Sequence, residues 1–75
     1  MYLKKVQKVI LEKTGIEPEE VEPADYFAED LNLGELELQE ILEALEEEYE
    51  LELTERIEEI ETIEDLVTLL SEELD

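Results

Sequence analysis

Apolar residues recur along this chain at the three- and four-residue spacing of amphipathic helices, and the clearest stripe lies in the middle. That stripe consists of Leu38, Ile41, Leu42, Leu45 and Tyr49. The opposite side of the same stretch holds one leucine followed by acids, namely Leu36, Glu40, Glu43 and Glu47. The pattern predicts a helix that begins near Gly34 or Glu35 and ends near Tyr49 or Glu50. One side should lie in a core, and the other should be almost entirely carboxylate.

A second apolar stripe predicts a helix at the start of the chain, from about Tyr2 to Thr14. Its members are Leu3, Val6, Val9 and Ile10. Gly15 follows directly and is a good stop signal, because glycine readily adopts the left-handed conformation that ends helices.

The last third of the chain predicts two more helices. Thr54 is expected to cap a helix of one or two turns that carries Ile57 and Ile60. Thr62 is expected to cap the final helix, with Asp65 three residues later in a capping-box-like arrangement. The apolar stripe of that final helix is Ile63, Leu66, Val67 and Leu70.

Residues 16–35 form a long connection that no continuous helix can cross, because Pro18 and Pro23 interrupt helical hydrogen bonding. Its apolar residues are irregularly spaced, and we expect them to pin the connection across the core. They are Ile16, Val21, Tyr26, Phe27, Leu31 and Leu33. The fold expected is therefore all-α: a single domain over residues 1–75, built as a small bundle of three main helices and one short helix with a long first loop.

The chain is strongly acidic, with 26 acidic residues against five basic ones and a formal net charge of −21. Four of the basic residues, Lys4, Lys5, Lys8 and Lys13, lie in the first helix. Phosphates would be repelled, so nucleic acid is excluded as a direct ligand and anionic membranes are disfavoured. A basic protein surface is the expected partner. The competing interpretation is that the acidity only keeps the protein in solution.

Little in the sequence supports catalysis or metal binding. The chain has no histidine and no cysteine, and its one serine is Ser71, so a nucleophile beside a base cannot be assembled in the usual way. Asp30, Asn32 and Gly34 have the spacing of the first half of a calcium loop, but Glu35 and Ile41 stand where that loop needs glycine and glutamate. We therefore expect neither an enzyme nor a specific metal site. We also expect a cytoplasmic protein, or one in an organelle if a transit segment has been removed, because no apolar run is long enough to span a membrane. The protein is expected to be a monomer.

Several residues, in order and at the right separations, resemble the acyl carrier protein family over nearly the whole chain. The end of the first loop is similar in Phe27 and in Asp30-Leu31, and the entry to the last helix in residues 60–66. The second helix is similar in Leu36, in Glu40-Ile41 and in residues 44–49, and Leu51 and Leu53 match the apolar residues that follow it. The resemblance implies a fold in which a helix-two serine carries 4'-phosphopantetheine and acidic residues dock basic partner enzymes.

The family's Asp-Ser-Leu motif aligns with Gly34-Glu35-Leu36, so Glu35 stands at the position of the phosphopantetheine serine. A carboxylate has no hydroxyl to take up the group, so Glu35 should not be modifiable and no cofactor is expected. The resemblance implies a docking surface of Leu36, Glu40, Glu43, Glu46 and Glu47, with Glu43 where the family usually keeps an apolar residue. Fatty-acid or polyketide synthesis enzymes are the partners that it suggests. It also implies an acyl space among Leu42, Leu45, Ile57 and Leu66, although these residues are better explained as core.

Three interpretations remain open on the sequence. The first is an acyl-carrier-protein-like module that cannot be loaded and that binds a basic partner through its second helix. The second is an engineered or specialised inactive form of a true acyl carrier. The third is a stable acidic scaffold with no carrier role. The sequence does not name the partner, the source, or whether the loss of the serine is natural.

Overall fold

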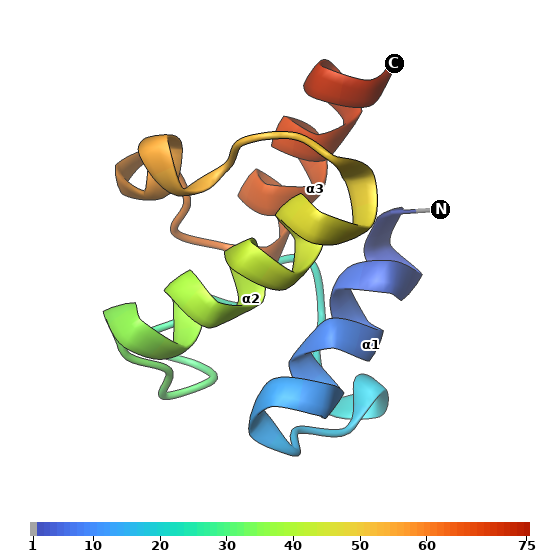
Figure 1. The fold of residues 1–75 in the computed structure, drawn as a ribbon. Helices are drawn as coiled ribbons and strands as arrows, with labels where there is room; N and C mark the ends of the chain where they lie inside the picture. The colour runs from blue at the N-terminus through green and yellow to red at the C-terminus, as the bar shows by residue number, and fades with distance from the viewer. Residues whose placement is uncertain (1) are drawn as a thin grey trace.

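The computed structural model describes residues 2–75 and contains three α-helices and two short 3₁₀ helices in that range. Figure 1 shows the three long helices arranged around one core, with the two 3₁₀ segments in their connections. The elements are α1 (Tyr2–Thr14), η1 (Pro18–Glu20), α2 (Glu35–Tyr49), η2 (Thr54–Glu59) and α3 (Ile63–Leu74). The expected all-α bundle is confirmed. In residues 2–75 the only strand-like pairing is an isolated antiparallel bridge between Tyr26 and Thr62.

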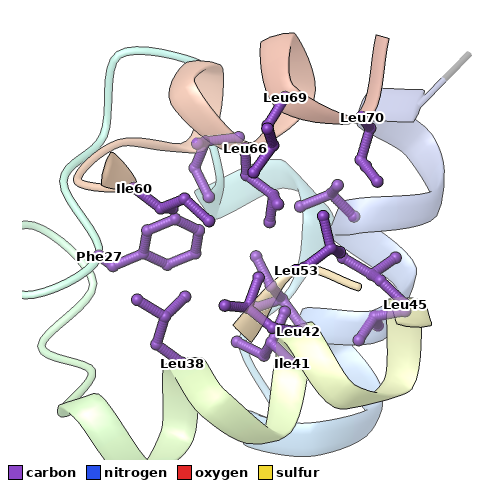
Figure 2. Packing of buried hydrophobic residues seen from close by; sticks show 14 of the residues in the cluster. Phe27, Leu38, Ile41, Leu42, Leu45, Leu53, Ile60, Leu66, Leu69 and Leu70 are labelled. Atoms are coloured by element: carbon purple, nitrogen blue, oxygen red, sulfur yellow. The ribbon is translucent and has the colours of Figure 1, made fainter. Parts of the chain in front are cut away.

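The predicted bounds of α1 and α2 are confirmed, and so is the side that each helix turns inward. In α2 the residues Leu38, Ile41, Leu42 and Leu45 are buried, and Tyr49 packs against the core from its edge. In α1 the buried members are Val6, Val9 and Ile10. Figure 2 shows the α2 side chains pointing into a cluster that also receives residues of α3 and of the connections. The periodicity missed one core residue, Leu69, which lies beside the predicted Leu70 and is 5% exposed.

The capping prediction for α3 is confirmed in full. The Thr62 hydroxyl accepts a hydrogen bond from the Asp65 backbone N–H at 3.1 Å, and the Asp65 carboxylate accepts one from the Thr62 N–H at 3.1 Å. This reciprocal pair satisfies two backbone donors that the first turn of a helix would otherwise leave without partners. The Ile63 N–H reaches the carbonyl of Asp25 at 3.0 Å, so the first loop completes the start of this helix.

The prediction for the short helix was wrong at its start. Leu53 occupies the capping position of η2, and Thr54 is its first residue. The Thr54 hydroxyl and N–H both donate to Glu46 of α2 instead of capping the turn. Ile60 is buried immediately after the helix, whereas Ile57 within it is half-buried.

The first loop is pinned to the core as expected, except at one residue. Val21, Phe27 and Leu33 are buried, but the Tyr26 side chain is 42% exposed. The backbone around Tyr26 pairs with Thr62 in extended form, and neighbouring side chains of an extended chain point to opposite sides. Since Phe27 points inward, Tyr26 must point out. The loop also contains the turn η1, whose start at Pro18 suits a residue that lacks a backbone donor.

The two ends of the described chain are joined through aromatic side chains. The Tyr2 hydroxyl donates to the Asp75 carboxylate at 2.6 Å, and this bond raises the pKa of Tyr2. The Tyr2 ring meets the Tyr49 ring edge-on, with the ring centroids 6.0 Å apart. The start of α1 therefore contacts both the end of α2 and the end of α3.

Candidate functional site

The candidate site begins at the first turn of α2, where Gly34 takes the capping position and Glu35 is the first helical residue. The Glu37 carboxylate accepts a hydrogen bond from the Gly34 N–H at 3.0 Å. Glycine has no side chain to return this bond, so the turn is capped from one side only. Glu35 and Glu37 lie at the positive end of the helix dipole, which stabilises negative charge there. Glu35 is exposed, as a site of modification or docking must be.

Four residues of α2 form one exposed surface, which we call the acidic face: Leu36, Glu40, Glu43 and Glu47. Leu36 is 75% exposed, more than any other large apolar residue among residues 2–75. The three glutamates follow it along the helix at intervals of three and four residues, which places them on one side. A shallow hollow beside them is also lined by Lys13, Ala44 and Glu48. The structure thus brings together four of the five predicted docking residues.

The fifth predicted docking residue, Glu46, lies outside the acidic face and forms hydrogen bonds to the connection after α2. It is half-buried, and one of its carboxylate oxygens accepts three hydrogen bonds. The donors are the Leu53 N–H at 2.6 Å, the Thr54 N–H at 2.9 Å and the Thr54 hydroxyl at 3.2 Å. These bonds favour the charged form and lower the pKa of Glu46, the one to Leu53 most strongly. Glu46 therefore fastens the connection after α2 to the helix itself.

Replacing Glu46 with glutamine is expected to reduce the loss of stability in acid. The pKa of Glu46 is lower in the folded chain than its ordinary value of 4.5, so its charge stabilises the fold above that pH. This stabilisation disappears as the pH falls through the lowered value. The free energy of unfolding of the unchanged chain should therefore fall more steeply below about pH 4.5 than that of Glu46→Gln. Urea unfolding followed by circular dichroism at pH 7, 5, 4 and 3 measures the difference.

Two variants separate the charge of Glu46 from its hydrogen bonds. Glu46→Ala removes every acceptor and should destabilise the fold at pH 7 by about 1–3 kcal/mol, because two backbone N–H groups lose their partner. Glu47→Gln removes the same charge from an exposed neighbour and should leave the acid slope unchanged. An equal change of slope in Glu46→Gln and Glu47→Gln would show that general charge, and not this cluster of bonds, sets the acid sensitivity.

Basic side chains neutralise only small parts of the surface. Lys5 of α1 pairs with Glu48 of α2 at 3.4 Å. Arg56 pairs with Glu59 and with Glu73 of α3, each at 3.0 Å. The Arg56 guanidinium also lowers the pKa of Glu59. None of these pairs includes Glu40, Glu43 or Glu47, although Glu48 and Lys13 line the hollow beside them. Most of the charge on the acidic face therefore remains to attract a partner.

An open groove of about 670 Å³, which was not predicted from the sequence, lies beside Glu35. Because it lies at the N-terminal end of α2, we call it the N-terminal groove. Its apolar lining comes from Phe27, Leu33, Leu38, Ile57 and Ile60. In Figure 2 the Phe27 ring lies between the side chains of Ile60 and Leu38. It forms where residues 26–38 meet residues 57–61, two segments that are distant in the sequence, so no local pattern could have predicted it.

The proposed acyl space among Leu42, Leu45, Ile57 and Leu66 is occupied by the core itself. Leu42, Leu45 and Leu66 have no exposed surface, and Ile57 packs against the same cluster. The calcium-like stretch also has a structural role. The Asp30 carboxylate accepts a hydrogen bond from the Tyr26 N–H at 2.8 Å, and Asn32 adopts the left-handed conformation, with φ of 57°.

Two features are absent from residues 2–75: a cluster of metal-binding side chains and a membrane-spanning helix. Among residues 2–75, no group of three or more acidic, histidine or cysteine side chains is placed to hold a metal ion. Within the same range, no helix combines the length and the apolar character needed to cross a membrane.

The chain matches a known protein family. The model of the family described as "phosphopantetheine attachment site" matches residues 4–70. The matched region begins in α1 and ends within α3, so it includes the core, the acidic face and the N-terminal groove.

Proposed function

The chain belongs to the phosphopantetheine-attachment family, and on that premise we propose that it is a carrier-type module that docks basic partner proteins through the acidic face of α2. We further propose that it is not loaded with phosphopantetheine, because Glu35 occupies the attachment position. Carrier domains generally interact with synthase enzymes, so the partners proposed are enzymes of fatty-acid or polyketide synthesis. As a carrier-type domain, it would act by binding a partner protein and would not catalyse a reaction itself.

The exposure of the acidic face is the observation that carries the docking proposal. Glu40, Glu43 and Glu47 are exposed along one side of α2, and the exposed Leu36 begins the same surface. A row of carboxylates speeds encounter with a basic patch and orients it. The apolar leucine then supplies area that a partner can cover, which gives the contact affinity as well as steering. Glu46 was expected to belong to this surface, but its bonds to Leu53 and Thr54 support a structural role instead.

The chemistry of position 35 carries the proposal that the chain is not loaded. Phosphopantetheine attachment needs a hydroxyl, and the glutamate offers only a carboxylate. Two threonine hydroxyls elsewhere take part in the fold: that of Thr54 donates to Glu46, and that of Thr62 caps α3. Ser71 lies in the last turns of α3, where its hydroxyl donates to Asp75 at 3.1 Å.

The acidic face can be tested with a phosphopantetheinyl transferase as a partner of defined chemistry. The variant Glu35→Ser provides a hydroxyl, so the rate at which it gains mass reports how well the transferase docks. Reversing Glu40, Glu43 and Glu47 to lysine in that background should slow loading about tenfold or more at low salt. Intact-mass spectrometry over time measures the rate.

A matched triple variant controls for net charge. Reversing the exposed Glu12, Glu19 and Glu20 in the same background changes the charge equally: Glu35→Ser takes the net charge from −21 to −20, and three reversals of two charges each take it to −14 in both proteins. These residues lie in α1 and η1, outside the acidic face, so loading should remain within about twofold of the background. If loading slows equally in the two triple variants, general electrostatic attraction explains the rate and no specific docking surface is needed. That result would refute the proposal.

A further inference from the structure

The N-terminal groove and the acidic face meet at the first turn of α2. Glu35 lies on the rim of the groove, and the next residue, Leu36, begins the acidic face. A partner that follows the acidic face toward the start of α2 would therefore arrive at the groove. Figure 1 shows this end of α2 beside the first loop, which supplies much of the opposite wall.

The groove has an apolar floor and an acidic rim. Phe27, Leu38 and Ile60 are 2%, 8% and 5% exposed, so each presents a small apolar surface, and the half-buried Ile57 adds more. The rim is formed by Glu29, Glu35, Glu58 and Glu61, all of them exposed. No lysine or arginine is part of the lining. The charge of the rim repels fatty acids and phosphorylated lipids and attracts groups that bring their own positive charge.

We propose that the N-terminal groove receives one apolar side chain from a basic segment of the partner protein. The inference rests on the proposed function, because the same segment would lie along the acidic face. Its lysines or arginines would face Glu40, Glu43 and the rim acids, while the apolar side chain would pack onto the floor formed by Phe27, Leu38 and Ile60. This arrangement gives an interface the usual form, in which a buried apolar anchor is surrounded by charged contacts.

A protein segment fits these two surfaces better than a free small molecule does, because it can cover more area and meet more of the acidic side chains. A free alkyl amine would satisfy the groove and a few rim acids, but it would leave the acidic face uncovered. A peptide segment covers both surfaces at once, and the linked contacts raise each other's effective concentration. The exposed Leu36 lies at the end of the acidic face that is next to the groove, where a bound segment would shield it from water.

The test uses two synthetic cationic helical peptides as probes. Both are built from lysine and alanine with equal charge, and one carries a central phenylalanine where the other carries alanine. The phenylalanine peptide should bind the unchanged chain about tenfold or more tightly, the effect of burying one large apolar side chain. Calorimetry gives the two affinities. Amide shifts at Phe27, Leu38 and Ile60, caused by the added ring, locate the site by NMR.

A pair of alanine variants decides whether the groove is responsible. Ala28 is exposed and lines the groove, so Ala28→Trp should fill it and remove the advantage of the phenylalanine peptide. Ala24 is exposed in the same loop but is not part of the lining, so Ala24→Trp should keep that advantage. Circular dichroism confirms that both variants fold. Equal affinity for the two peptides in the unchanged chain overturns the proposal, as does loss of the advantage in both variants.

Two further measurements separate this inference from the proposed function. Reversing Glu40, Glu43 and Glu47 should weaken both peptides, and if it weakens neither, the docking function fails while the ratio between the peptides still reports the groove. Dodecylamine tests the free-ligand alternative. Should it shift the same amides at concentrations where the phenylalanine peptide does not, the groove is a small-molecule site and the proposal is wrong.

Discussion

Replacing Glu35 with serine is expected to convert a chain that gains no mass into one that gains a single phosphopantetheine. The substitution places a hydroxyl at the first residue of α2, in an exposed position. The helix N-terminus there stabilises the negative charge of the attached phosphate. Incubation with coenzyme A and a broad-specificity phosphopantetheinyl transferase, followed by intact-mass measurement, gives the result directly.

The matched control is Glu37→Ser, which introduces the same hydroxyl two residues later in the same helical turn. It should remain unmodified, because the transferase must recognise a position and not merely an exposed serine. If the variants at 35 and 37 both stay unmodified, the docking surface has diverged along with the attachment residue. Modification of the unchanged chain would mean that Glu35 does not occupy the attachment position.

Replacing Leu42 with alanine is expected to be the most destabilising single change in α2. Leu42 has no exposed surface and lies in the middle of the helix stripe, in contact with the central cluster. Removing a buried leucine side chain usually destabilises a protein by about 2–5 kcal/mol. A domain of 75 residues has a total stability of about 4–11 kcal/mol, so a large share would be lost. Urea unfolding followed by far-ultraviolet circular dichroism should show a much lower midpoint.

Leu36→Ala is the control, because it makes the same chemical change in the same helix at a site that is 75% exposed. Its free energy of unfolding should change by no more than about 0.5 kcal/mol. The same variant should weaken partner docking, since Leu36 begins the acidic face. Similar destabilisation by the two substitutions would mean that the inward and outward sides of α2 have been assigned incorrectly.

Local signals were sufficient to predict the main helices. Apolar spacing placed the inward side of α2 at Leu38, Ile41, Leu42 and Leu45, and the structure buries all four. The Thr62–Asp65 cap was predictable because both partners lie within one turn and their spacing is fixed by helix geometry. Glu35 could be singled out only through the family resemblance, since its own neighbourhood is simply acidic.

Local sequence signals could not predict features that form only when distant segments of the chain come together. Glu46 has the sequence appearance of one more surface acid, and only the return of the chain at Leu53 and Thr54 gives it three donors. Thr54 has the sequence appearance of a cap because threonine is common at that position, but the Glu46 carboxylate offers it a stronger, charge-assisted bond. The N-terminal groove depends in the same way on the meeting of the first loop, α2 and η2.

The position of α1 also sets the order of events when the chain is synthesised. α1 leaves the ribosome first, yet its buried side packs on both α2 and α3, and the Tyr2 hydroxyl bonds to Asp75. The first loop likewise waits for late residues, since Phe27 and Ile63 use the backbone of Glu61 and Asp25 as hydrogen-bond partners. The core therefore cannot close until α3 has emerged. Until then the apolar stripes of α1 and α2 are exposed, and mutual repulsion among the acidic side chains of α2 would help to keep nascent chains from aggregating.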